Sequence, residues 1–361
     1  MAASTLTEVA RLAGVSPATA SRVLNGSARK PGKDIAERVR QAADSLSYIP
    51  NAQAQGLAKS SSGLIGLIVH DIADPYFAAI ARGVQDAARD QRKMVLLATT
   101  GGAPAEEREA VAAFAARRAD SIVIAGSRSS RPEDGDDNAE LAAELDRYCR
   151  NGGQVAVVGH PVVGATAMEG YHVVAVPNQE LAGALAARLA ENWDGDFVIV
   201  GGPEGLLTSD DRVRGFQEGL AKAGRAPAEI LRTSFNRSGG YEAGLKLAAR
   251  IKAGRAEDGG GSGRKLCIFA VNDVMAIGAS AALRAEGLRI PRDATIAGFD
   301  DIETLRDFRP ALSTVRLPLE DIGRLATRAT APGAGNSGGQ EEDTVPPVSG
   351  EVTLRRSTEA A

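Results

Sequence analysis

The chain has 361 residues, of which 43% are hydrophobic and 24% charged, as is ordinary for a folded protein of two or three domains. Its two cysteines form no CxxC pair and its three histidines no HExxH motif, so we expect no disulfide framework, no zinc finger and no catalytic metal site. No phosphate loop of the GxxxxGK[ST] type and no GxSxG motif occurs, and we expect neither a cofactor nor enzymatic activity. No apolar run approaches the roughly 20 residues of a membrane span and no leader is evident, so we expect a cytoplasmic protein without membrane contact.

The formal net charge of −4 is unevenly distributed along the chain. Residues 1–60 contain eight Lys and Arg against four Asp and Glu, so this part carries +4 and the remainder −8. A basic N-terminal region on an acidic body indicates that the N-terminal region has a nucleic-acid partner.

The first fifty residues are predicted to form three short helices. Thr5 and Glu8 have the spacing of a capping box, and Gly14 is suited to end the first helix. Ser16 can cap the next helix, so that two short helices are joined by three residues as in a helix-turn-helix. A third helix, about 34–47, would close an all-α core.

The second predicted helix presents a polar N-terminal half that could reach base edges in the major groove. Arg22 on this helix is suited to bidentate recognition of guanine, whereas Ser16 and Arg29 are suited to phosphate contacts. The alternative is an amphipathic helical hairpin whose charges are only solvated.

Residues 51–62 are predicted to form a hinge helix and linker. The segment is short and Ala-rich and contains Gly56, so it is too weak a helix to fold alone in water. Such a segment is expected to fold against a partner, and the alternative is a linker in which Leu57 is incidental.

The run from Thr5 to Gly26 resembles the N-terminal signature of the LacI (lactose repressor) family, and Ser47 to Asn51 resembles that family's boundary between third helix and hinge. The resemblance implies that paired hinge helices of two subunits enter the minor groove, where Leu57 would wedge a base step. The predicted DNA contacts are Thr5, Ser16, Pro17, Ala18, Thr19, Ser21, Arg22, Asn25, Arg29, Tyr48, Asn51, Ala54, Leu57 and Lys59.

From Leu64 onward, short apolar runs alternate with amphipathic helical patterns, which predicts an α/β body with parallel sheets covered on both faces. The predicted strands are 64–69, 94–98, 121–125, 155–158, 197–200, 267–270 and 295–297. The predicted helices include 77–90, 106–117, 181–192, 212–223, 240–252 and 273–286. Gly- and Asp-rich stretches at 126–138, 254–265 and 331–344 are expected to be surface loops, the last two disordered.

This set of strands is too long for one sheet, so two doubly wound lobes are expected. The predicted domains are 1–50 (helix-turn-helix), 51–62 (hinge) and 63–361 (ligand-binding core), with a first lobe at about 63–174 and 306–331 and a second at about 175–305 and 345–358.

Ligands of open α/β sheets bind beyond the carboxyl ends of the strands. Polar and aromatic residues follow four of the predicted strands at these ends, namely 74–77, 201–203 with 212–216, 272–273 and 298–301. We therefore expect them to converge on one cleft between the lobes.

The body is similar to the family's periplasmic-binding-protein-like core, and 310–316 and 354–358 resemble later landmarks of the family. The resemblance implies a polar clamp of Arg212, Asn272 and Asp300, which could bind hydroxyl groups, and apolar walls made by Tyr76, Phe77 and Phe235. Each of these residues could instead be a helix cap or a core residue.

The chain departs from the family pattern at two places. Gly159 and His160 stand where many members carry Asp-Arg, and Pro177 and Asn178 stand where Asp-Asn is usual. His160 is either a further effector contact or a partly buried surface histidine, and the identity of the effector does not follow from the family.

We expect a homodimeric repressor that binds a near-palindromic operator in double-stranded DNA and responds to a small-molecule effector, a carbohydrate. A nucleobase or nucleoside acting as corepressor is the alternative. A transport solute-binding protein would lack the basic head, and an enzyme would need a nucleophile–base pair, so both other classes fit the sequence poorly.

Overall fold

The computed structural model describes residues 4–25, 31–49, 61–166, 168–191, 193–257, 265–331 and 346–359. The chain forms two compact units, Met1–Gly63 and Leu64–Ala361. Among the described helices, none combines the length and the apolar character needed to cross a membrane.

The described residues of the first unit form three helices, as predicted: α1 (Leu6–Ala13), α2 (Pro17–Asn25) and α3 (Lys33–Ser45). The capping box is present, since Thr5 Oγ1 accepts from the Glu8 amide and Glu8 Oε2 accepts from the Thr5 amide. Gly14 ends α1 in the left-handed conformation (φ 65°), and Ser16 Oγ accepts from the amide of Thr19 at the start of α2. Local sequence signals therefore define this helix-turn-helix.

The three helices bury one small apolar core. Its buried members are Val9, Ala10, Ala13, Ala20, Val39, Ala42 and Ala43, and half-buried side chains such as Leu6, Val23, Ile35 and Leu46 pack around them. These residues recur at helical spacing on each helix, which is why the sequence pattern predicts them.

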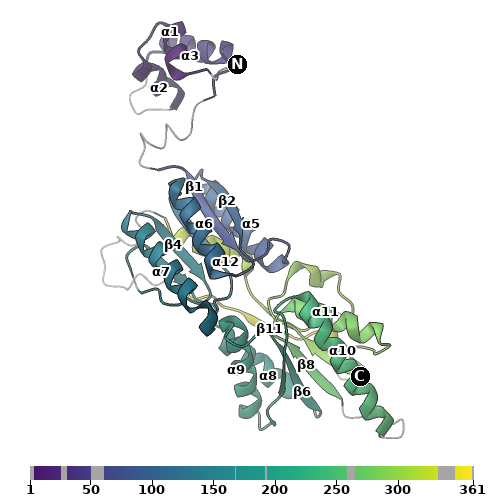
Figure 1. Cartoon of the computed structure of the whole chain (residues 1–361). Coiled ribbons are helices and arrows are strands. Elements are labelled where there is room, and N and C mark those ends of the chain that lie inside the picture. The colour runs from purple at the N-terminus through teal and green to yellow at the C-terminus, as the bar shows by residue number, and fades with distance from the viewer. Residues whose placement is uncertain are drawn as a thin grey trace. The chain divides into compact units, whose positions relative to one another are not determined.

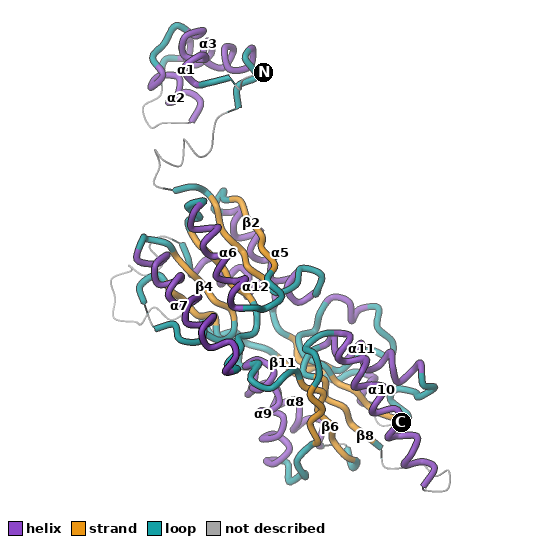
Figure 2. The backbone as a smooth tube through the Cα atoms, in the orientation of Figure 1, coloured by secondary structure: helices purple, strands orange, loops and turns teal. Residues whose placement is uncertain are grey.

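The second unit contains two parallel sheets, each lying between helices (Figures 1 and 2). The first sheet has the order β2-β1-β3-β4-β5. Its strands are β1 (Leu64–Val69), β2 (Met94–Thr99), β3 (Ser121–Ala125), β4 (Gln154–Val158) and β5 (Tyr171–Val174). Helices α5 (Pro75–Asp90) and α12 (Leu319–Ala329) pack together on one face, and α6 (Pro104–Ala116) and α7 (Gly135–Arg150) pack together on the other. We call this sheet and its helices the first lobe.

The second sheet has the order β7-β6-β8-β9, and with its helices it forms the second lobe. The strands are β6 (Asp196–Gly201), β7 (Glu229–Arg232), β8 (Leu266–Ala270) and β9 (Ala294–Ala297). Helix α8 (Asn178–Ala190) packs on α9 (Leu207–Lys222), and α10 (Arg237–Glu257) packs on α11 (Asp273–Ala285), on opposite sides of the sheet (Figure 1). Stacked Phe216 and Phe269 rings, 4.4 Å between centroids, lie in its core.

The chain passes from the first lobe to the second after β5 and returns to α12 after β9. The return segment contains a short helix η2 (Glu303–Arg306) and β10 (Thr314–Arg316), which pairs antiparallel with β11 (Glu351–Thr353). A last 3₁₀ turn, η3 (Arg356–Thr358), contacts β9. These segments connect the lobes and hold the carboxyl end of β9.

All seven predicted strands of the body are present, but the prediction for 126–138 as a surface loop is wrong. Ser127, Arg128 and Ser129 are buried, 132–134 form a short helix η1 (Pro132–Asp134), and α7 begins at Gly135. The predicted loop at 254–265 is also partly wrong, because α10 continues to Glu257. Residues 258–264 and 332–345 lie outside the described part of the chain.

Candidate functional site

The exposed surface of α2 carries the side chains predicted to read DNA. Pro17, Ala18 and Arg22 are exposed, as is Ser16 immediately before the helix, whereas Ala20 is buried in the core. The helix therefore turns one face inward and leaves its N-terminal half accessible, as insertion into a major groove requires.

Other predicted DNA contacts in this unit have intramolecular partners. The hydroxyls of Ser16 and Thr19 lie 2.9 Å apart, and Asn25 Nδ2 donates to Ser21 Oγ at 2.9 Å. Tyr48 is half-buried against the helical core. Thr5 is exposed and takes part in the capping box with Glu8, and the remaining predicted contacts, Arg29, Asn51, Ala54, Leu57 and Lys59, lie outside the described residues.

In the second unit, Arg212 is the centre of a buried polar cluster. It extends from α9, is 2% exposed, and donates from Nη2 to Asp300 Oδ1 at 2.9 Å. Its Nη1 donates to the carbonyl of Val271 at 2.7 Å and its Nε to Asn178 Oδ1 at 2.9 Å. The guanidinium carbon also lies 3.9 Å from the centroid of the Phe299 ring. The cluster therefore joins α9 to α8 and to the ends of β8 and β9.

Asp300 is 4% exposed, and burial raises its pKa to about 7, although the Arg212 charge acts in the opposite direction. Asp74, at the start of α5 in the first lobe, adds to this increase through its own charge. The pKa of Tyr76 is raised by burial and by the charge of Asp300. The charges of the first lobe and of the Arg212–Asp300 pair therefore influence one another across the boundary between the lobes.

The carboxyl of Asp300 is held by an unusual stretch of backbone. Asp300 has φ 116° and Asp301 has φ 56°, both in the region that non-glycine residues avoid. The backbone of Asp300 is fixed on both sides, because its amide donates to Val315 and its carbonyl accepts from Leu317.

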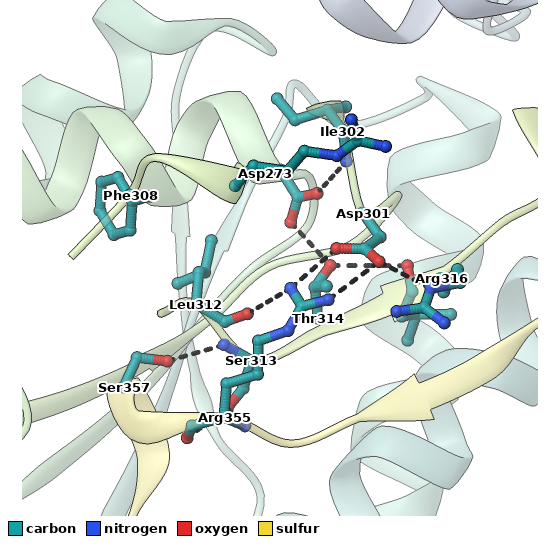
Figure 3. Close-up of polar contacts among 12 residues, drawn as sticks. Asp273, Asp301, Ile302, Phe308, Leu312, Ser313, Thr314, Arg316, Arg355 and Ser357 are labelled. Atoms are coloured by element: carbon teal, nitrogen blue, oxygen red, sulfur yellow. Dashed lines mark hydrogen bonds and ion pairs between the residues drawn. The ribbon is translucent and has the colours of Figure 1, made fainter. Parts of the chain in front are cut away.

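A network of polar contacts surrounds this backbone (Figure 3). Asp301 accepts from Arg316 and, through both oxygens, from Arg355, and these charges lower the Asp301 pKa. On the other side, Asp273 accepts from Thr314 Oγ1 at 2.7 Å and from the Ile302 amide at 3.0 Å. The return segment between the lobes thus sets the position of Asp300.

The remaining predicted effector residues have varied surroundings. Asn272 Oδ1 accepts from the Met275 amide at 2.8 Å and caps α11, which is the alternative role considered for it. Phe235 is half-buried against Gly202, where a Cβ would lie 2.8 Å from the ring. The Phe77 ring contacts that of Tyr76, with centroids 5.0 Å apart.

His160 contacts the opposite lobe. Its Nε2 lies 2.8 Å from Asp211 Oδ2 on α9, and each side chain is 23% exposed. His160 thus forms a hydrogen bond between the lobes, a contact that the sequence did not indicate.

An open groove of about 720 Å³ lies between the lobes, and none of the seven predicted effector residues is among those that line it. It is lined by residues adjacent in sequence to the predicted effector residues, among them Asp74, Asn236, Val274 and Ile302, together with Arg284 and Phe308. The groove therefore gives access from solvent to the region where the two lobes meet.

Several polar residues near the site were not predicted. Asn178 fixes Arg212, and Glu107 is paired with Arg128 in the first lobe. Asp273, which fixes the segment after Asp300, was among the residues expected at the strand ends. The unusual Pro177–Asn178 pair marked the position of Asn178 in the sequence, whereas nothing marked Glu107. Among the described residues, no group of His, Cys, Asp or Glu could hold a metal ion.

Comparison with known proteins accounts for both units. Residues 5–51 match the family model for bacterial regulatory proteins of the lacI family, and residues 173–358 match that for a periplasmic binding protein-like domain. The ribose operon repressor of Halalkalibacterium halodurans is 32% identical over 330 residues, covering 90% of this chain and 88% of the relative. The regulator GalS of Salmonella typhimurium is 31% identical over 340 residues, covering 91% and 90%.

Solved structures share the whole architecture. The regulator CelR in complex with cellobiose has a TM-score of 0.65 and 25% identity, covering 98% of this chain and 99% of its own. The lac repressor dimer bound to operator and an anti-inducer has a TM-score of 0.76 over 99% of this chain and all of its own, and its 21% identity shows the fold alone. With a helix-turn-helix unit, a two-lobed α/β unit and a 32% identical relative along nearly its whole length, the chain belongs to the LacI family of bacterial regulatory proteins.

Proposed function

We propose that this protein is a repressor that binds operator DNA and responds to a small effector bound where the two lobes meet. The supporting observation is that one chain combines a helix-turn-helix whose reading face is exposed with a buried Arg212–Asp300 cluster whose charges also act on Tyr76 of the first lobe. In this division residues 1–50 read DNA, residues 51–62 form the hinge and residues 63–361 sense the effector. The protein acts in the cytoplasm and catalyses no reaction.

The proposed effector is a carbohydrate. A buried carboxylate at Asp300 is suited to accept hydrogen bonds from sugar hydroxyls, and the rings of Tyr76, Phe77 and Phe235 are suited to pack against a sugar face. Cellobiose is the ligand of the similar CelR structure, and the relatives include a ribose operon repressor. A nucleobase or nucleoside acting as corepressor is the alternative, and the experiment below distinguishes the two.

Two copies of the chain are proposed to bind one near-palindromic operator. Edge strand β2 leaves Met94 64% exposed and Leu97 46% exposed, and such an apolar strand edge favours burial against a second copy. Met94→Glu with Leu97→Glu is expected to convert a sedimenting dimer into a monomer and to weaken operator binding. A variant that still sediments as a dimer would place the interface elsewhere.

The test begins with selection of the operator from a randomised duplex library, using the full chain. Binding of the selected duplex is then measured by fluorescence anisotropy, alone and with ribose, galactose, cellobiose, adenosine and cytidine in turn. The proposal expects a sugar to shift the operator affinity and Asp300→Ala to abolish the shift while leaving operator binding intact. A shift produced only by a nucleoside would establish the alternative, and failure to select any sequence would refute the DNA-binding role.

A further inference from the structure

Two short segments of the lobes contact each other through their backbones, at a place where the chain does not cross between lobes. The amide of Leu207 donates to the Arg128 carbonyl at 2.9 Å, and the amide of Ser130 donates to the Gly205 carbonyl at 2.8 Å. Ser129 and Leu206 are the partners of the resulting antiparallel bridge. We call residues 127–130 of the first lobe and 205–208 of the second the interlobe clasp.

A buried ion pair holds the first-lobe half of the clasp in position. Both oxygens of Glu107, which is 1% exposed, accept from the guanidinium of Arg128, which is 3% exposed. Burial alone would raise the pKa of Glu107, but the Arg128 charge and a contact with His70 lower it, so the carboxylate stays ionised. Asn138 on α7 also donates to the Ser129 carbonyl at 2.9 Å. The segment is thus fixed to α6 and α7 before it meets the second lobe.

The second-lobe half of the clasp belongs to the start of α9. The amide of Thr208 donates to Ser127 Oγ at 3.2 Å, and one turn further on Asp211 pairs with His160 of the first lobe at 2.8 Å. The next residue of this helix is Arg212, the centre of the buried cluster. One helix therefore binds the first lobe through its first turns and the proposed effector site through the adjacent residue.

We propose that the interlobe clasp is the connection through which occupancy of the Arg212 cluster is transmitted to the first lobe, with Glu107 and Arg128 as its positioning residues. A movement of α9 that accompanies effector binding has to break or tighten backbone hydrogen bonds to 127–130. The first lobe begins at Leu64 and follows the DNA-reading helices in the chain. In this proposal, a change in the orientation of the first lobe therefore alters the operator contacts. This coupling rests on the proposed function, whereas the existence of the clasp does not.

A reversible disulfide tests the proposal in the full chain. Partners in an antiparallel bridge have Cα atoms about 4.5–5.5 Å apart, within the range of about 4.4–6.8 Å that a disulfide spans, so Ser129→Cys with Leu206→Cys is suited to cross-link the clasp. The native Cys149 and Cys267 do not compete, because burial raises their pKa values to about 11 and about 12. Arg316→Cys with Glu351→Cys, at partners in the β10–β11 ladder, is the control pair, and the two single-cysteine variants detect links between molecules.

We expect both cysteine pairs to oxidise within one molecule in the absence of any sugar. The oxidised clasp variant should lose the effect of the sugar panel on operator affinity, and reduction with dithiothreitol should restore it. Failure of the clasp pair to oxidise while the control pair does would refute the clasp. A clasp variant that oxidises but keeps its full response to sugar would refute the role in transmission.

Hydrogen exchange supplies a readout that needs no effector. In the unmodified chain the amides of Ser130 and Leu207 should be protected, and Glu107→Gln should speed their exchange while the amides of β3 remain protected. Free exchange of both amides in the unmodified chain would refute the clasp. If no sugar shifts operator binding by the unmodified chain, the proposed function fails, yet the exchange and oxidation results still decide whether the clasp exists.

Discussion

Replacement of Arg212 by Met tests the reasoning about the buried cluster most severely. The Arg212 and Asp300 side chains are only 3% and 6% exposed, so removal of the guanidinium leaves a carboxyl group in the interior without its cation. Breaking a buried pair in this way costs about 3–5 kcal/mol of the free energy of unfolding. The variant also loses hydrogen bonds to Val271 and Asn178.

The loss of unfolding free energy in Arg212→Met should depend on pH, and the direction of this dependence follows from the pKa of Asp300. Burial already raises this pKa to about 7, and Arg212 is the group that opposes the increase, so in the variant the pKa rises further. A carboxyl group whose pKa is higher in the folded than in the unfolded state destabilises the fold as pH rises through the interval between the two values. The loss should therefore be largest at pH 8 and smaller at pH 5.5, where the carboxyl is protonated.

Urea unfolding can be followed by the fluorescence of the only tryptophan, Trp193, which is buried in the second lobe. Arg188→Met is a matched control, because its ion pair with Glu191 is more than half exposed and should cost at most about 0.5 kcal/mol. Arg212→Met with Asp300→Leu should recover much of the loss by removing the isolated charge. A cost below about 1 kcal/mol, or one that is equal at pH 5.5 and pH 8, would refute the reasoning.

Three further substitutions test other parts of the account. Arg22→Ala should weaken binding to the selected operator by about 1–3 kcal/mol and relax sequence preference, and an anisotropy titration that shows unchanged preference would exclude base reading. Thr5→Ala should cost about 1 kcal/mol through loss of the capping box, measured as faster amide exchange in α1, and unaltered exchange would contradict it. Gly83→Ala should lower the free energy of unfolding, measured in urea, by about 1–3 kcal/mol, because the added Cβ would lie 1.8 Å from the Glu320 carbonyl oxygen. The Cβ of Gly135→Ala would meet no atom within 4 Å, so this control should leave the free energy of unfolding unchanged.

The parts of the fold that the sequence predicts are those governed by local rules. The capping box at Thr5, the left-handed Gly14 and the apolar strand runs each act within a few residues, so their patterns are visible in the chain. The unpredicted β7 (Glu229–Arg232) is an exposed edge strand with one half-buried residue, and β5 (Tyr171–Val174) has only four residues. Neither produces the apolar run by which a buried strand is identified.

The wrong prediction for 126–138 has a tertiary cause. The stretch is polar and Gly-containing, which is typical of a surface loop, but Arg128 is neutralised by Glu107, 21 residues away, and its backbone is paired with the other lobe. In the same way, the rule about strand ends brings Arg212 and Asp300 together, as the hydrogen bond between them shows, whereas the place of Tyr76 in an effector site stays a prediction. It does not predict that His160 pairs with Asp211, because that contact depends on how the lobes meet.

The central claim is that occupancy of the cluster between the lobes controls operator binding. The most direct measurement is the affinity of the full chain for its selected operator, determined by anisotropy with and without the sugar that most increases the thermal stability of the protein. The account predicts a change of about fivefold or more, corresponding to a coupling free energy of about 1 kcal/mol, which Asp300→Ala abolishes. A sugar that stabilises the protein through Asp300 yet leaves operator affinity unchanged would contradict it.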